Sequence, residues 1–249
     1  MEKMTLLGHL DELRQRIIRA AIVLAITTGF CLFFSKKIFH WFQLPMLKAL
    51  GEGGTFIATA PTEGIVTYLK LSLVAGVLLG CPFLFYQLWR FIAPGLKTKE
   101  ARLVLPFVFF STFLFAGGAL FGYFVVFPAG FSYFVSVLAD TNIKFMPQME
   151  SYLSFASRLL FAFGIVFELP LLMTFLAYAG LIHHQQLSKA RRYVIVIIFT
   201  VAAILTPGPD VISQVLLAIP LWILYEAGII LARIFGRKKL DESQSTPDT

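Results

Sequence analysis

Long runs of apolar residues recur along the whole 249-residue chain, and they leave few folds open to it. The runs approach about 20 residues, the length that an α-helix needs to cross the hydrocarbon core of a bilayer. They lack the apolar–polar alternation of the strands in a membrane β-barrel. Hydrophobic residues make up 58% of the chain and charged residues 14%, whereas soluble domains are about a quarter charged. The sequence therefore predicts an all-α membrane protein.

Six apolar segments are expected to span the bilayer. Their approximate ranges are 20–34, 65–91, 103–127, 152–179, 193–205 and 211–231. Residues 38–45, after the first span, mix aromatic and polar side chains, as short interfacial helices do. A second outer loop is expected over 128–150, because Pro128, Gly130 and Pro147 interrupt the apolar pattern. Acids precede the first run, unlike in a cleaved signal peptide, so the first span is expected to be retained.

Basic residues gather on alternate connections between the predicted spans. One side has Lys3, Arg14, Arg16, Arg19, Lys97, Lys99, Arg102, Lys189, Arg191, Arg192, Arg233, Arg237, Lys238 and Lys239. The other side has Lys36, Lys37, Lys48 and Lys144. Because basic connections stay in the cytoplasm, both termini are predicted to be cytoplasmic. Residues 1–236 are expected to form one six-span domain, and 237–249 a disordered polar tail. The net charge of +7 thus reflects membrane topology and not binding to nucleic acid.

The fifth apolar run is short. Tyr193–Leu205 contains 13 residues, which as a helix is about 20 Å long, against a hydrocarbon core of about 30 Å. Either the helix continues into its polar flanks or the bilayer is thinner there. We expect local thinning beside the fifth and sixth spans.

No pattern of an enzyme or of a cofactor site is found in the sequence. The histidines lack the His-Glu-x-x-His spacing of a zinc site, and neither a Gly-x-Ser-x-Gly motif nor a phosphate-binding glycine loop is present. Cys31 and Cys81 lie inside apolar runs and are expected to be packed thiols without a disulfide. The prediction is a protein that is not an enzyme and that needs no cofactor or metal.

Two acids lie at the predicted cytoplasmic surface. Glu12 precedes Arg16 by four residues, and the simplest interpretation is a helical ion pair contributing about 0.3–0.5 kcal/mol. Glu100 follows Thr98 closely, where a carboxylate favours the start of a helix. Together they place two carboxylates among loops that are otherwise basic, so a site for a basic ligand is an alternative interpretation. Residues alone leave both interpretations open.

Glu168 differs from these acids because it lies inside an apolar span, two residues before Pro170. A charge there costs at least about 2.5–3.5 kcal/mol on insertion scales. The residue is therefore expected either to be protonated or to face a polar interior. A functional role and a structural hydrogen bond are the two alternatives.

Four motifs carry a resemblance to a known family. They are His9-Leu10-Asp11-Glu12-Leu13-Arg14-Gln15-Arg16, Tyr86-Gln87-Leu88-Trp89-Arg90-Phe91-Ile92-Ala93-Pro94-Gly95-Leu96, Phe163-Gly164-Ile165-Val166-Phe167-Glu168-Leu169-Pro170 and Asp210-Val211-Ile212-Ser213-Gln214. In this order, over nearly the whole chain, they resemble the TatC family, the multispan core of the twin-arginine protein translocase. The resemblance implies that Glu12 and Glu100 bind the paired arginines of signal peptides on folded cargo. It further implies that Arg14 and Phe91 support that site.

Other positions also match the family. Pro45 and Asp210 match outer-loop positions, and Glu168 matches a polar position of a concave interior. Thr206 and Gln214 lie where the resemblance implies docking of single-span TatA- and TatB-type partners. Residues 206–210 read Thr-Pro-Gly-Pro-Asp, where the family pattern is a tighter Thr-Pro-Pro-Asp.

The resemblance implies a subunit of a bacterial cytoplasmic (inner) membrane complex in which the chain associates with further copies of itself. Since no nucleotide site is present, the proton gradient is expected to supply the energy. The alternative function is a proton-coupled small-solute transporter with Glu168 as relay. A membrane scaffold whose charges are all structural is a third interpretation.

Overall fold

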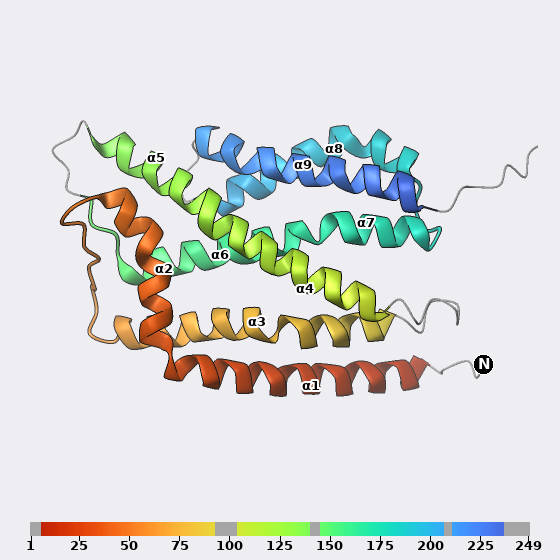
Figure 1. Ribbon diagram of the computed structural model, residues 1–249, viewed down its shortest axis with the longest axis horizontal. Helices are drawn as coiled ribbons and strands as arrows, with labels where there is room; N and C mark the ends of the chain where they lie inside the picture. The colour runs from red at the N-terminus through yellow and green to blue at the C-terminus, as the bar shows by residue number, and fades with distance from the viewer. Residues whose placement is uncertain (1–5, 93–103, 140–144, 207–210, 237–249) are drawn as a thin grey trace, which may run out of the picture.

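The computed structural model describes residues 6–92, 104–139, 145–206 and 211–236, and the statements below concern these residues. They are almost entirely helical (Figure 1). In chain order the elements are α1 (Leu6–Phe33), α2 (Ser35–Leu50), α3 (Glu63–Ile92), α4 (Val104–Phe121), a π-helical turn η3 (Gly122–Val126), α5 (Phe127–Ala139), α6 (Met149–Phe167), α7 (Leu169–Tyr178), α8 (His184–Leu205) and α9 (Val211–Phe235). Glu100, Asp210 and the tail 237–249 lie outside the described residues.

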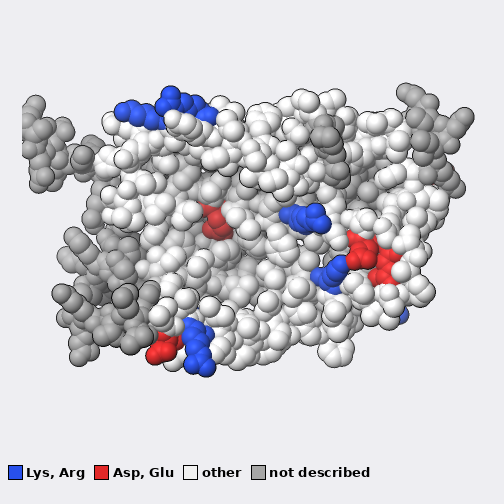
Figure 2. All heavy atoms as spheres, turned by 180° about the vertical axis from the view of Figure 1, so that it is seen from behind, with Lys and Arg blue, Asp and Glu red and all other residues white. Residues whose placement is uncertain are grey.

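Five helical stretches of the described chain are long and apolar enough to cross a bilayer. They are Leu10–Phe33, Glu63–Ile92, Val104–Leu138, Met149–Tyr178 and Val211–Phe235. Figure 2 shows that charged side chains are sparse across the middle of one face and gather towards its two ends. The prediction of an all-helical membrane protein is confirmed. The fifth predicted span, 193–205, lies in α8, whose first half carries Lys189, Arg191 and Arg192.

The long helices run alongside one another between two opposite ends of the molecule (Figure 1). The start of α1 and the ends of α3, α7 and α9 lie together at one end, which we call the inner end. The opposite, outer end holds α2 and the starts of α3, α6 and α9. Helix α1 therefore begins at the inner end, and α9 finishes at that same end.

The third predicted span is longer than expected. A loop was predicted from Pro128 onwards, but helix continues through η3 and α5 to Ala139. The N–H of Phe127 bonds to the carbonyl of Gly122, a π-type hydrogen bond. Such local adjustment lets a membrane helix pass a proline without stopping. Phe127 and Phe131, on either side of the expected break, are almost fully buried, so tertiary packing outweighed the proline signal.

Helix α2 crosses the outer end of the molecule (Figure 1). A helix predicted at 38–45 is present, although it begins at Ser35, extends to Leu50 and contains Pro45. Its apolar face, including Phe42, is buried, while Trp41 is 68% exposed. The hydroxyl of Tyr152 donates to the carbonyl of Phe42 at 2.6 Å, and that of Tyr123 to the carbonyl of Trp41 at 2.5 Å. These bonds fasten α2 to α6 and η3.

Candidate functional site

The first candidate site lies at the inner end, where the start of α1 meets the end of α3. Arg16 Nε donates to Glu12 Oε1 at 3.0 Å, and its Nη2 bonds to the same oxygen. Arg16 Nη1 also approaches Gln87 Oε1 at 3.4 Å. Gln87 is only 6% exposed, and the side chains of Arg16 and Glu12 are 11% and 21% exposed. The predicted ion pair thus forms, but in a partly buried position between two helices.

The second oxygen of Glu12 sets this carboxylate apart. Glu12 Oε2 is buried and has no hydrogen-bond partner within the described part of the chain. A buried carboxylate oxygen without a donor costs free energy. Glu12 therefore retains capacity to accept a hydrogen bond from a further cationic group.

The other residues predicted for this site are distributed unevenly around it. Phe91 is half-buried, one helical turn after Gln87, and so lies on the same side of α3. Arg14 is exposed, and a spacing of two residues turns it to a different side of α1 from Glu12. Glu100 belongs to the connection between Ile92 and Val104, outside the described residues. Its proximity to Glu12 stays a prediction.

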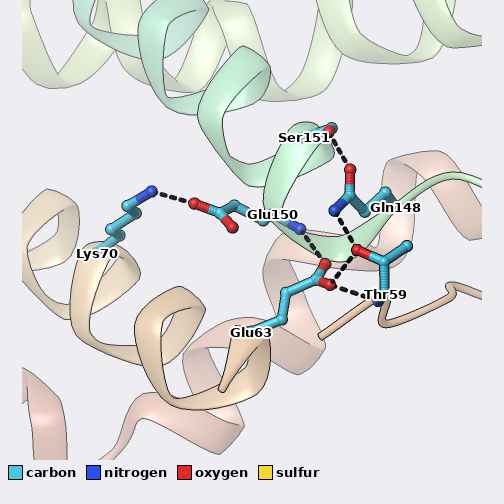
Figure 3. A network of polar contacts seen from close by, with 6 residues as sticks. All are labelled: Thr59, Glu63, Lys70, Gln148, Glu150 and Ser151. Atoms are coloured by element: carbon cyan, nitrogen blue, oxygen red, sulfur yellow. Dashed lines mark hydrogen bonds and ion pairs between the residues drawn. The ribbon is translucent and has the colours of Figure 1, made fainter. Parts of the chain in front are cut away.

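A second polar cluster, at the outer end, was missed from the sequence (Figure 3). Glu63, the first residue of α3, is 2% exposed. One of its oxygens accepts hydrogen bonds from the N–H groups of Thr59 at 2.5 Å and Ala60 at 3.3 Å, and from the Thr59 hydroxyl at 3.0 Å. The other accepts from the N–H of Glu150 at 3.0 Å. The Glu63 carboxylate therefore holds the segment that precedes α3 and satisfies an N–H group in the first turn of α6.

This cluster ties the segment before α3 to the start of α6. Gln148 Nε2 donates to Thr59 Oγ1 at 2.7 Å, and Ser151 Oγ donates to Gln148 Oε1 at 2.6 Å. Lys70 forms an ion pair with the Glu150 side chain. A parallel β-bridge between Ile57 and Gln148 runs beside them. An acid at the start of an apolar helix was the one local signal, because the contacts of this cluster with residues 148 and 150 span 80 or more positions in the sequence.

Glu168 lies at the junction of α6 and α7, as the sequence predicted for an acid inside a span. Its backbone carbonyl accepts from Leu172 N at 2.8 Å, so the helical path continues across the junction. Its Oε1 atom is buried without a hydrogen-bond partner among the described residues. The hydroxyl of Ser111 on α4 and the thiol of Cys81 on α3 lie close enough to interact with this carboxyl. Two polar groups, from α3 and α4, therefore lie near the Glu168 carboxyl.

Residues predicted for the outer loops and for partner docking are spread over the outer end. Pro45 is buried within α2. Thr206 is 9% exposed at the end of α8, and its hydroxyl donates to the carbonyl of Ala203 at 3.2 Å. Gln214 is half-buried in the first turn of α9. The structure thus places Thr206 and Gln214 at adjoining ends of two consecutive helices.

Glu226 of α9 forms an ion pair with Arg191 of α8. Its two oxygens accept hydrogen bonds from Arg191 Nε and Nη2, each at 2.7 Å. This bidentate pair joins α9 to α8. A guanidinium and a carboxylate match each other in this forked arrangement, and the partner comes from 35 residues earlier.

No metal centre is suggested by the arrangement of side chains. Across residues 6–92, 104–139, 145–206 and 211–236, no group of three or more His, Cys, Asp or Glu residues could hold a metal ion. Cys31 and Cys81 are buried free thiols. The candidate sites therefore consist of carboxylates, guanidinium groups and hydroxyls that bind by charge and hydrogen bonding.

Comparison with known proteins gives a consistent family. The model of the TatC family, described as Sec-independent protein translocase protein (TatC), matches residues 8–220. The Sec-independent protein translocase protein TatC of Desulforapulum autotrophicum is 47% identical over 99% of this chain and 91% of its own length. The protein of that name from Escherichia coli K12 is 39% identical over 94% of this chain and 90% of its own length.

Solved structures agree with the sequence relatives. A crystal structure described as the twin arginine translocase receptor TatC has a TM-score of 0.79 and 39% identity, covering 91% of this chain and 98% of that one. A second, of the same receptor in DDM, has a TM-score of 0.80 and covers 90% and 99%. The chain thus belongs to the TatC family, the core receptor component of the twin-arginine, Sec-independent protein translocase, and is a transport protein rather than an enzyme.

Proposed function

We propose that this chain binds the paired arginines of signal peptides at its inner end, with Glu12 and Glu100 as the acidic groups. The observation that supports this most directly is the Glu12 carboxylate, which is held by Arg16 through one oxygen and has no described partner at the other. Phe91 and Gln87 lie on the neighbouring face of α3. Glu100 follows the end of α3, beside which Glu12 lies.

The chemistry of this site favours arginine over lysine. A guanidinium offers a planar fork of donors that matches a carboxylate, whereas an ammonium is a compact charge without that geometry. A hydrogen bond to a charged group contributes about 1.5–3 kcal/mol net. Loss of either acid, for example in Glu12→Gln, should weaken peptide binding by roughly ten- to a hundredfold. Asp11→Asn, at an exposed neighbouring acid, is the matched control.

Membrane topology places this site in the cytoplasm under the same proposal. The inner end carries Arg14, Arg16, Arg19, Lys189, Arg191, Arg192 and Arg233. Basic groups of this kind remain on the cytoplasmic side. Helix α8 serves as the fifth of six spans, so both termini are cytoplasmic in a bacterial inner membrane. Export of folded cargo then draws on the proton gradient.

Single-span partners are proposed to dock at the outer ends of α8 and α9. Thr206 and Gln214 lie there, and the exposed surface of these helices is apolar, including Ile204, Val211 and Ile212. An apolar helix surface suits the side of another membrane helix. TatA- and TatB-type subunits are the proposed occupants, and Pro45 and Asp210 are proposed to act at the same outer surface.

Photo-crosslinking tests the peptide site. A photoreactive residue at position 12 or 100 should crosslink a signal peptide with paired arginines, and replacement by paired lysines should abolish the crosslink. The same probe at exposed Gln15 serves as the control for proximity without recognition. Equal crosslinking of both peptides would reduce the site to a nonspecific acidic patch and contradict the proposal.

A second candidate function follows from Glu168, a half-buried residue whose Oε1 atom is buried without a hydrogen-bond partner among the described residues. A carboxyl in this position suits a proton relay in small-solute transport. This function predicts proton-driven solute uptake by the chain alone in vesicles, abolished by Glu168→Gln. Export of folded cargo that survives Glu168→Gln would remove Glu168 from the proposed energy coupling.

A further inference from the structure

A buried hydrogen bond connects α3 to α4 near the inner end. Trp89 Nε1 donates to Ser111 Oγ at 2.8 Å. Trp89 is 6% exposed and Ser111 is fully buried. An indole N–H is only a donor, whereas a hydroxyl both accepts and donates. Ser111 therefore uses an acceptor position for Trp89 and keeps its own proton for a second group.

The indole of Trp89 is held in one orientation by two other helices. It stacks on Phe107 of α4, with centroids 4.7 Å apart and planes at 27°. It meets Phe175 of α7 edge to face, with centroids 4.9 Å apart and planes at 74°. Phe107 and Phe175 also contact each other at 5.3 Å. This closed set of three rings fixes where the N–H points.

The second group available to Ser111 is the carboxyl of Glu168. The two side chains lie close enough to interact, and Glu168 Oε1 is buried without a described partner. Trp89 then donates a hydrogen bond to Ser111, and the Ser111 hydroxyl donates one to the Glu168 carboxyl. Hydrogen bonds in such a chain polarise one another in a medium of low dielectric constant. A half-buried carboxyl within an apolar span is sensitive to the orientation of a nearby hydroxyl.

We propose that Trp89 and Ser111 are positioning residues for the Glu168 carboxyl and couple it to the inner ends of α3 and α4. Trp89 lies two residues before Phe91, and Ser111 lies two helical turns after the start of α4. A ligand that displaces the end of either helix changes the Trp89–Ser111 bond and thereby the hydrogen bonding of Glu168. The coupling rests on the proposed peptide site, whereas the positioning role does not.

Infrared spectroscopy of the full chain in lipid vesicles tests the positioning role. The bands of the Glu168 carboxyl are identified as those lost in Glu168→Gln. Ser111→Ala and Trp89→Phe should each shift these bands, and Ser111→Thr, which keeps the hydroxyl, should leave them near their original position. Ser72→Ala removes another fully buried serine hydroxyl, one that bonds to the carbonyl of Tyr68. This control variant should leave the bands unchanged.

Two results overturn the positioning role. One is an unchanged Glu168 band in Ser111→Ala, and the other is an equal shift in Ser72→Ala, which would indicate a general effect of losing a buried hydroxyl. Neither result depends on peptide binding. Trp222→Phe, at a half-buried tryptophan of α9, is the matched control for Trp89→Phe and should leave the bands in place.

Adding a peptide with paired arginines tests the coupling. The Glu168 bands should shift in the parent protein and stay in place in Trp89→Phe, while a peptide with paired lysines has no effect on either. If the arginine peptide crosslinks to position 12 and the bands of the parent protein do not move, the coupling is wrong and the proposed function stands. If no peptide crosslinks, both the coupling and the proposed function fail.

Discussion

At the scale of single residues, the buried and half-buried carboxylates differ in how much of their hydrogen-bonding capacity the protein itself uses. Glu63 accepts four hydrogen bonds, and Glu226 is engaged through both oxygens by Arg191. Glu12 and Glu168 each retain a buried oxygen without a described partner. Fully satisfied carboxylates hold elements together, whereas unsatisfied ones are available to a ligand or a proton.

Replacement of Glu63 tests the structural role of the outer cluster. Glu63→Gln keeps the shape but puts an amide N–H₂ opposite one of the backbone N–H donors, so at least one hydrogen bond to a charged group is lost. Such a bond contributes about 1.5–3 kcal/mol. We expect a lower unfolding midpoint in detergent and faster hydrogen exchange at the amides of Thr59 and Glu150.

Glu52→Gln is the control for this change, since Glu52 is an exposed acid in the same outer segment. It should leave both the midpoint and the exchange rates near those of the parent protein. Equal exchange at Thr59 in the two variants would show that Glu63 does not hold the segment.

At the scale of elements, glycine controls how closely the helices approach. A Cβ at Gly118 of α4 would lie 2.5 Å from the carbonyl oxygen of Phe163 on α6. A Cβ at Gly117, the preceding residue, would meet nothing within 4 Å. The two glycines therefore have different roles despite being neighbours: Gly118 allows backbone contact between α4 and α6, and Gly117 does not.

Alanine substitution separates the two roles. Gly118→Ala should destabilise the protein by about 1–3 kcal/mol, the usual cost of overpacking, because the atom it meets belongs to the backbone and cannot rotate away. Gly117→Ala should be neutral or slightly stabilising, since alanine favours helix over glycine by about 1 kcal/mol. Unfolding midpoints in detergent measure both changes. Equal midpoints would contradict close packing of α4 against α6.

Helix α8 is the element whose length fits the bilayer least well. It contains 22 residues, but its first part is polar, so the apolar part is Tyr193–Leu205. That part is about 20 Å long against a core of about 30 Å. We expect a spin label at exposed Ala203 to lie nearer the headgroups than a label at exposed Leu73 of α3. Normal bilayer thickness beside Thr206 would exclude local thinning.

At the scale of the whole molecule, the alternation of helix direction gathers the proposed peptide site and most described basic residues at one end. α1 and α3 lie side by side and run in opposite directions, which brings Glu12 close to Gln87 (Figure 1). The opposite end carries α2 and the cluster around Glu63. At the inner end, Glu12 thus has an oxygen without a described partner, whereas at the outer end both oxygens of Glu63 accept hydrogen bonds.

Labelling with a membrane-impermeant thiol reagent tests this orientation. Single cysteines at exposed Lys48 or Gln185 would be introduced after replacing the buried Cys31 and Cys81 with serine. Position 48 should react in intact cells, and position 185 only after the inner membrane is permeabilised. The reverse result would place the proposed peptide site outside the cytoplasm and contradict the proposed function.

The sequence by itself determined what depends on local pattern. The length of the apolar runs predicted the long helices, and the amphipathic residues 38–45 predicted the helix across the outer end. Glu168 was recognised because it is an isolated acid in an apolar run. The motif around Glu12 indicated the family before the structure was known. Each of these signals lies within a few turns of helix, so neighbouring residues are enough to specify it.

Tertiary structure decided what depends on residues distant in the chain. Helix continued past Pro128 because Phe127 and Phe131 are buried in a core that local pattern does not reveal. One hydrogen-bond donor to Glu63 lies on another helix, 87 residues away, and the partner of Glu226 lies 35 residues away on α8. The contact of Trp89 with Ser111 bridges 22 residues. The physical reason is that packing and charge pairing act between surfaces that only the folded chain brings together.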